Sequence, residues 1–115
     1  MKILFLLNEA PYGNDKYYNA LRTAIQLQKQ DRSIKVWVYL MSDSVTGAVI
    51  GQKEKPGQYN IGEMLSDILK QGGEVKLCTS CAESRGVTAV IQGVVLGTLP
   101  DLTKWIVESD KTLTF

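Results

Sequence analysis

The sequence predicts an α/β protein with a mainly parallel sheet and helices on both faces. Three observations support this: apolar runs of strand length, helical periodicity between them, and spacings long enough for crossover connections. The run over residues 3–7, Ile-Leu-Phe-Leu-Leu, is typical of a strand buried on both faces. At 115 residues and without an internal repeat, the chain is expected to form one domain spanning 1–115.

The first crossover is expected after a turn-rich segment over residues 8–14. Asp15 can cap a helix that ends near residues 30–31. Spacings of three and four residues predict that this helix buries Tyr18, Leu21, Ala24 and Ile25. The β-branched and aromatic run 34–41 then predicts a second strand, with a short helix capped within 42–44 after it.

The middle of the chain contains its clearest helix. The polar stretch 51–58, with two glycines and a proline, predicts a loop, and such a loop can be mobile. Asn60 is expected to cap the helix, and Gly72-Gly73 to end it. Its apolar face comprises Ile61, Met64, Leu65, Ile68 and Leu69.

The last third repeats the alternation of strands and helices. Strands are expected at 74–78 and 94–96, with a short helix or turn from about 79 to 87 between them. Thr98 can cap a helix, and a final strand over 111–115 follows it. The residues of this helix expected to face inward are Leu99, Leu102, Ile106 and Val107.

Composition argues against several classes of partner. The formal net charge is +1, and the 13 basic residues are scattered, so neither nucleic acid nor an anionic membrane is expected as a partner. No stretch approaches the ~20 apolar residues of a membrane span, and the apolar run near Met1 is too short for a secretion signal. We therefore expect a cytoplasmic protein whose cysteines are reduced.

The most informative segment is 78–86, at the predicted carboxyl end of a strand. Such ends form the sites of parallel sheets. Cys78 begins a helical turn there, where free backbone N–H groups and the helix dipole favour a thiolate. Cys81 lies one turn further, and Arg85 about two turns, so that Arg85 can add a positive charge on the same face. The pattern predicts a nucleophilic sulfur with an anion bound beside it.

Other interpretations of these cysteines differ in strength. A cytosolic cysteine is often an inert core residue, and Cys81 taken alone fits that description. A structural zinc site needs four ligands, but the chain has two cysteines and no histidine, so no metal is expected within one chain. Only a site shared between subunits, or one completed by carboxylates, stays open. A Cys-x-x-Cys dithiol that cycles with a disulfide stays open. The loop after the first strand matches no phosphate-binding motif, so no cofactor is expected.

Several short blocks of residues lie in a recognisable order along the whole chain. The strongest block is Leu77-Cys78-x-x-Cys81-x-x-x-Arg85-Gly86. The other blocks are residues 8–13, 40–43, 51–53, 59–61, 97–99 and 110–115. Together these blocks resemble the DsrE/DsrF-like sulfur-relay family, in particular its small YchN-like members.

The resemblance implies a flavodoxin-like three-layer fold assembled as a ring-shaped homo-oligomer, a hexamer of two trimers or a trimer. It implies that Cys78 carries sulfur as a persulfide between donor and acceptor proteins. Cys81 departs from relay members that have one cysteine here. Asn8, Tyr12 and Ser42 can line the mouth of the site, or serve only as turn formers and helix caps.

Three functional hypotheses follow. The first is a sulfur carrier or sulfurtransferase with Cys78 as acceptor and Arg85 stabilising the anion. The second is a thiol–disulfide oxidoreductase that uses Cys78 and Cys81. The third is a non-catalytic ring that binds a small anion or a protein partner.

Overall fold

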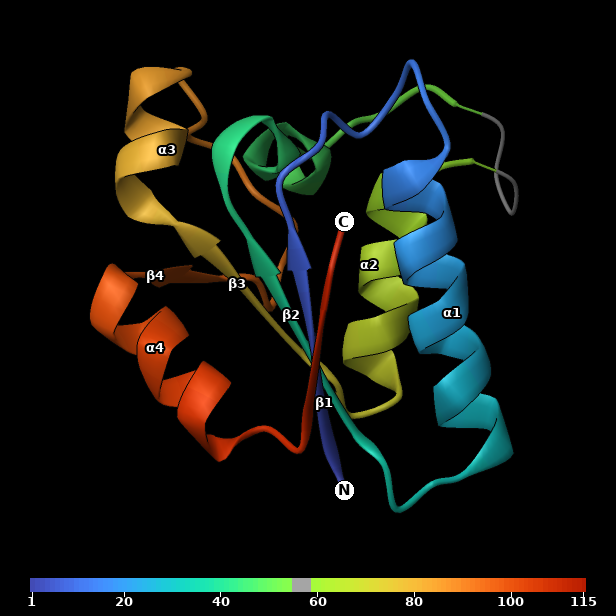
Figure 1. The fold of residues 1–115 in the computed structure, drawn as a ribbon. Coiled ribbons are helices and arrows are strands. Elements are labelled where there is room, and N and C mark those ends of the chain that lie inside the picture. Colours follow the sequence, from blue (N-terminus) through green and yellow to red (C-terminus); the bar gives the residue numbers. More distant parts are fainter. Residues whose placement is uncertain (55–58) are drawn as a thin grey trace.

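A computed structural model describes residues 1–54 and 59–115 and confirms the predicted α/β class. Its described strands form one five-stranded sheet in the order β4-β3-β2-β1-β5, and every neighbouring pair is parallel (Figure 1). The strands are β1 (Lys2–Leu7), β2 (Lys35–Leu40), β3 (Glu74–Cys78), β4 (Val95–Gly97) and β5 (Lys111–Thr114). Their carboxyl ends therefore meet at one edge of the sheet.

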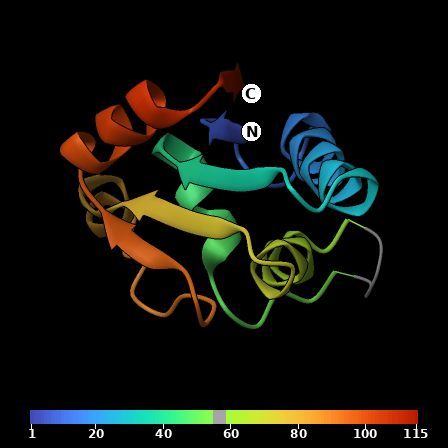
Figure 2. The same cartoon turned by 90° about the horizontal axis from the view of Figure 1, so that it is seen from below.

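Helices cover both faces of this sheet, as predicted (Figure 2). Two of them, α1 (Lys16–Gln30) and α2 (Ile61–Lys70), pack side by side on one face, and α4 (Leu99–Glu108) covers the other. Two short helices, the 3₁₀ helix η1 (Ser42–Ala48) and α3 (Thr79–Ser84), lie at the carboxyl ends of β2 and β3. None of the helices described has the length and apolar content needed to cross a bilayer.

Alternation along the strands divides the core into two layers. Ile3, Phe5 and Leu7 face the layer beneath α1 and α2, and Leu4 faces the layer beneath α4. The α4 layer is mainly aromatic. It consists of Leu4, Trp37, Tyr39, Leu102 and Trp105, with Cys78 packed at its margin. The Trp37 and Trp105 rings stack with centroids 4.9 Å apart.

Two helices begin at the caps that the sequence predicts. The Asn60 side chain accepts a hydrogen bond from the Glu63 backbone N–H at 3.0 Å. Thr98 forms a reciprocal capping box with Asp101 and so starts α4 directly after β4. Both caps satisfy backbone donors that the first helical turn leaves free.

The prediction for α1 needs two corrections. Asp15 occupies the cap position, but its side chain makes no capping hydrogen bond; Asn14 instead accepts from the Lys16 N–H at 2.9 Å. Tyr17, not Tyr18, enters the core, where its hydroxyl donates to the Ser44 carbonyl at 2.9 Å. The buried face of α1 comprises Tyr17, Ala20, Leu21, Ala24 and Gln28, and Ile25 is only half-buried.

The prediction for α4 is wrong at three of its four inward positions. Leu102 is buried as predicted, but Leu99, Ile106 and Val107 are exposed, Val107 by 84%. The second buried position belongs to Trp105. The large Trp105 ring stacks on Trp37 and meets Tyr39 edge-on. Two buried side chains, Leu102 and Trp105, are therefore enough for α4 to cover this face of the sheet.

The remaining elements agree closely with expectation. The short fourth strand is displaced by one residue from the predicted 94–96. The short helix after β2 forms as a 3₁₀ helix, and the segment 79–87 begins as α3. Of the predicted loop 51–58, residues 51–54 form no helix or strand, and 55–58 lie outside the described residues.

Candidate functional site

Cys78 lies at the junction between β3 and α3. It is the last residue of the strand and also the N-cap of the helix, with an extended backbone (φ −67°, ψ 117°). The next residue, Thr79, anchors the junction because its hydroxyl donates to the Gly97 carbonyl of β4 at 2.8 Å. The thiol therefore sits where the first N–H groups of a helical turn point.

Hydrogen bonds to the sulfur favour its ionised form. The Cys78 Sγ lies 3.3 Å from the Ser80 Oγ. Partial burial raises the pKa of the Cys78 thiol, but hydrogen bonds from the side chains of Ser80 and Cys81 and from their backbone N–H groups outweigh it, so the pKa lies below its ordinary value. As the pH rises, Cys78 is thus the first of the two cysteines to become a thiolate.

Cys81 has the opposite character. Burial raises the pKa of the Cys81 thiol, and so does the hydrogen bond that it gives to Cys78; a backbone hydrogen bond from Ser42 and the charge of Arg85 only partly oppose this. Both cysteines are free and half-buried. Cys78 therefore loses its proton at a lower pH than Cys81, whose thiol donates a hydrogen bond to the Cys78 sulfur.

Arg85 lies at the same edge but is bound by other groups. Its Nε contacts the Asp43 Oδ1 at 2.8 Å, and its Nη1 donates to the Cys81 carbonyl at 3.1 Å and the Ser84 Oγ at 3.0 Å. These contacts fasten α3 to η1. The positive charge of Arg85 lowers the pKa of Cys81, while the groups that lower the pKa of Cys78 are hydrogen-bond donors.

The three residues expected at the mouth separate into two places. The Ser42 hydroxyl donates to the Asn8 Oδ1 at 3.4 Å, and Ser42 reaches Cys81 through its backbone. Its φ of +53° is a left-handed conformation that a serine adopts at a cost of roughly 1–3 kcal/mol. Tyr12 instead contacts Gln52 and accepts from the Ile61 N–H at 3.0 Å, so the structure joins it to the start of α2.

A cavity of about 460 Å³ opens beside Cys78, between α3 and the start of α4. Tyr39, Met41 and Leu99 supply apolar walls, and Gly97 forms part of the lining. The Tyr39 hydroxyl donates to the Thr98 carbonyl at 2.7 Å. Burial, followed by the nearby charge of Cys78, raises the pKa of Tyr39 to about 12. A larger cavity, of about 580 Å³, lies beside α2 and has no cysteine in its lining.

Two residues of this site, Ser80 and Tyr39, were not predicted from the sequence to belong to it. Ser80 could have been found because a hydroxyl in the first turn after a helix-starting cysteine can reach its sulfur. Tyr39 was assigned only to a strand, although a buried tyrosine needs a partner for its hydroxyl and often marks a polar boundary. Within residues 1–54 and 59–115, no group of three or more potential ligands could hold a metal ion.

Comparison with known proteins agrees with this architecture. The model of the DsrE/DsrF-like family matches residues 1–115. The chain belongs to the DsrE/DsrF-like family. It is 43% identical to the protein YchN of Escherichia coli over 99% of this chain and 98% of YchN. An uncharacterized protein of Methanopyrus kandleri is 36% identical over 98% of this chain and 93% of its own length.

Solved structures show the same fold. The crystal structure of the E. coli YchN protein superposes with a TM-score of 0.93 over 99% of this chain and 98% of that one. A protein of unknown function from Methanobacterium thermoautotrophicum has a TM-score of 0.78 over 99% of this chain and 98% of its own, at 14% identity. At that identity the likeness concerns the fold alone.

Proposed function

We propose that this protein is a sulfur carrier or sulfurtransferase that accepts sulfane sulfur on Cys78 as a persulfide. The observation that carries the proposal is the set of donors around the Cys78 sulfur: the Ser80 hydroxyl, the Cys81 thiol and two backbone N–H groups. A thiolate is the nucleophilic form of cysteine. Membership of the DsrE/DsrF-like family, which is linked to sulfur relay, supports the same chemistry.

The loading step conserves atoms and charge. The Cys78 thiolate attacks the outer sulfur of a donor R–S–SH, a new S–S bond forms at Sγ, and the donor's S–S bond breaks. The thiolate R–S⁻ leaves, and the proton stays on the transferred sulfur until solvent removes it. The product Cys78–S–S⁻ is again an anion, and the donors that hold the thiolate can hydrogen-bond it.

Arg85 supports this step indirectly. Because it binds the Cys81 carbonyl and Asp43, it holds the first turns of α3 against η1 and so keeps the donors of that turn in place. Asn8 and Ser42 lie at the same edge, and Ser42 contacts Cys81 through its backbone. We assign these residues a positioning role and Cys78 the covalent one.

Intact-protein mass measurement after incubation with inorganic polysulfide tests the proposal. The wild type and Cys81→Ser are expected to gain the mass of one sulfur atom, which a reducing agent removes, whereas Cys78→Ser gains nothing. Circular dichroism of each variant checks that the fold is retained. Equal loading of the wild type and Cys78→Ser would refute the proposal, since the sulfur would then reside elsewhere.

A second candidate, a thiol–disulfide oxidoreductase, is favoured by the hydrogen bond between the two thiols. In that chemistry the Cys78 thiolate attacks a substrate disulfide R–S–S–R, forming a mixed disulfide and releasing R–S⁻. Cys81 then gives up its proton to solvent and its sulfur attacks the Cys78 sulfur. The Cys78–Cys81 disulfide forms and the second R–S⁻ leaves, so the substrate is reduced and the dithiol is oxidised. Equilibration with glutathione buffers of graded potential, followed by mass analysis, distinguishes the two. A reversible intramolecular disulfide near physiological potentials supports the oxidoreductase, whereas a dithiol at every potential favours the carrier.

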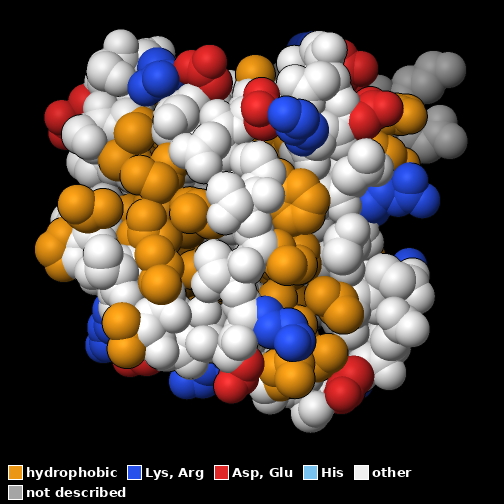
Figure 3. Space-filling view, viewed as in Figure 1, with side chains coloured by type: hydrophobic (Ala, Val, Ile, Leu, Met, Phe, Trp, Pro, Cys, Tyr) orange, Lys and Arg blue, Asp and Glu red, His pale blue; other side chains and the backbone are white. Residues whose placement is uncertain are grey.

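We further propose a homo-oligomer, a hexamer or a trimer, as the resemblance implies. Exposed apolar side chains gather over β4 and α4, on one side of the molecule in Figure 3. They include Leu96, Ile106 and Val107. A contiguous exposed apolar surface is a common mark of an interface. Light scattering on the purified protein measures the mass of the assembly directly.

A further inference from the structure

Resting on the proposed function, we propose that the Cys78 cavity selects one class of sulfur donor: a small organic donor with a single negative charge and an apolar group bonded to the atom that bears the sulfane sulfur. An organic thiosulfonate has this chemistry. Inorganic thiosulfate, a dianion without an apolar group, is the donor that the cavity discriminates against. The charges and the walls of the cavity both favour such a donor.

The charged lining is of the wrong sign for a dianion. Among the described residues that line the cavity there is no lysine or arginine, and the charged one is Glu83 of α3. A donor approaching the Cys78 thiolate therefore meets two negative groups. Charges of like sign in a site slow the entry of a charged partner and weaken its binding, and the effect is larger for a dianion than for a monoanion.

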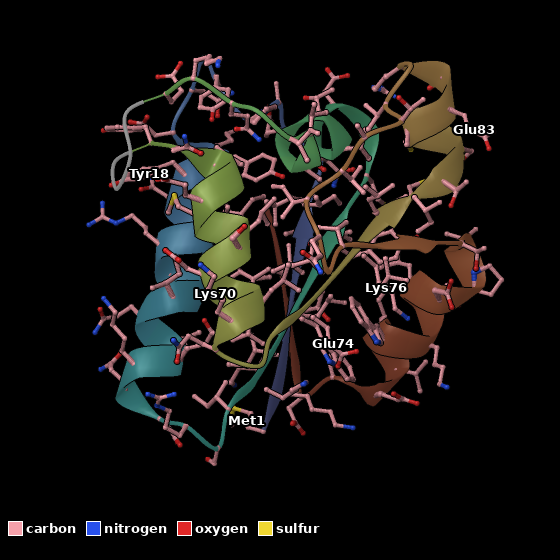
Figure 4. All side chains as sticks on the ribbon, turned by 180° about the vertical axis from the view of Figure 1, so that it is seen from behind. Met1, Tyr18, Lys70, Glu74, Lys76 and Glu83 are labelled. Carbon is pink, nitrogen blue, oxygen red and sulfur yellow. The ribbon has the colours of Figure 1, made fainter. Side chains whose placement is uncertain are left out.

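Two cations of β3 and the end of α3, Lys76 and Arg85, are held by other groups. Arg85 is bound to Asp43 at 2.8 Å. Lys76 shares the face of β3 that carries Cys78, but its Nζ lies 4.5 Å from the centre of the Trp105 ring and 3.9 Å from Asp101. Figure 4 shows Lys76 beside α4 and Glu83 on the separate helix α3. Neither cation lines the cavity to neutralise a second donor charge.

The walls favour an apolar group. Tyr39 is buried, Met41 is half-buried and Leu99 is 63% exposed, so an apolar substituent can cover these side chains as it enters. The volume of about 460 Å³ lies within the roughly 300–1,000 Å³ typical of small-molecule sites. A sulfite-like group of thiosulfate placed there loses water without gaining a partner, which is unfavourable.

Both reactions balance without another reagent. With benzenethiosulfonate, the Cys78 thiolate attacks the terminal sulfur, the S–S bond to the sulfonyl sulfur breaks, and benzenesulfinate leaves with the electron pair. With thiosulfate, the same attack releases sulfite. Each yields the same Cys78–S–S⁻ product, so mass measurement reads both on one scale.

The experiment measures the rate of Cys78 loading by benzenethiosulfonate and by thiosulfate and takes the ratio of the two rates. The same ratio is measured for N-acetylcysteine, a free thiol without a cavity. Dividing the first ratio by the second removes the intrinsic difference in reactivity between the donors. The wild type is expected to favour benzenethiosulfonate at least tenfold more than the free thiol does. Glu83→Gln should raise the thiosulfate rate about twofold to fivefold at low salt, and Leu99→Ser should lower the benzenethiosulfonate rate. Glu108→Gln, an exposed charge change elsewhere on the surface, is the matched control and should change neither rate.

The outcomes separate this inference from the function on which it rests. A normalised ratio near one, or a preference for thiosulfate, overturns the donor selectivity while Cys78 still loads, so the carrier function survives. A smaller preference in Glu83→Gln and Leu99→Ser, but not in Glu108→Gln, supports the assignment of the cavity. No loading of the folded wild type by either donor or by polysulfide refutes both.

Discussion

Replacing Ser80 with alanine removes one hydrogen-bond donor from the Cys78 sulfur, which should raise the Cys78 pKa and slow its alkylation. A hydrogen bond to a charged group contributes about 1.5–3 kcal/mol where it is well shielded. The Ser80 Oγ–Cys78 Sγ contact is 3.3 Å long and lies at a half-exposed sulfur, where water replaces part of it. About half of that range, roughly 0.75–1.5 kcal/mol, is therefore expected for this hydrogen bond to the thiolate, and its loss should raise the Cys78 pKa.

The assay is the rate of iodoacetamide alkylation of Cys78 as a function of pH, in a Cys81→Ser background so that one thiol reports. Below the pKa, Ser80→Ala should react about three to ten times more slowly, because its thiolate fraction is smaller. Its plateau at high pH should rise by less than about threefold, since a more basic thiolate is a better nucleophile.

Ser84→Ala is the matched control for this experiment. It deletes a serine hydroxyl from the same helix, but that hydroxyl bonds the Cys81 carbonyl and Arg85, not the Cys78 sulfur. Its midpoint should coincide with that of the parent. If Ser80→Ala shows no upward shift, or if Ser84→Ala shifts as far, hydrogen bonding from Ser80 is not what stabilises the thiolate.

Three further perturbations test the surrounding structure. The pKa of Tyr39 is raised from 10.0 to about 12 in the folded state, so its contribution to stability is complete below pH 10 and is lost as the pH rises towards 12. The unfolding free energy of the wild type should therefore fall between pH 10 and 12. In urea titrations, Tyr39→Phe should show a smaller fall over the same pH range. Gly97→Ala places a Cβ 3.0 Å from the Tyr39 hydroxyl and 3.1 Å from its ring, so it should cost about 1–3 kcal/mol and slow alkylation of Cys78; unchanged stability and rate would contradict this packing. Asn60→Ala removes the cap of α2 and should cost about 1 kcal/mol by thermal unfolding, and a change in Cys78 reactivity would contradict the separation of α2 from the site.

Much of the fold could be predicted because strand and helix periodicity reflects burial directly. The faces of α1 and α4 could not. Tyr17 and Tyr18 are adjacent aromatic residues, and either can begin the apolar face of α1. Tyr17 is the buried one because its hydroxyl finds a hydrogen-bond acceptor inside the core, the Ser44 carbonyl. On α4, the exposed Leu99 and Val107 are as apolar as the buried Leu102. Hydropathy alone does not distinguish a core contact from an exposed apolar surface.

The site was predictable to the level of a segment. A cysteine at the carboxyl end of a strand, followed by a second cysteine, located Cys78 and Cys81 together, and their proximity is confirmed. The contacts of Arg85 could not be predicted from the sequence, because its nearest partner, Asp43, is 42 residues away in the chain. Tyr12 separates from the cysteines for the same reason: its contact with Ile61 depends on how distant segments pack.

The central claim is that Cys78 is an accessible thiolate at a pH where Cys81 is still a thiol. Native protein treated with a limiting amount of iodoacetamide near neutral pH, then digested and analysed by peptide mass, measures both sites at once. We expect alkylation mainly at Cys78, with a pH midpoint below that of a free cysteine. Preferential alkylation of Cys81, or two thiols that stay unmodified until the protein unfolds, would contradict it.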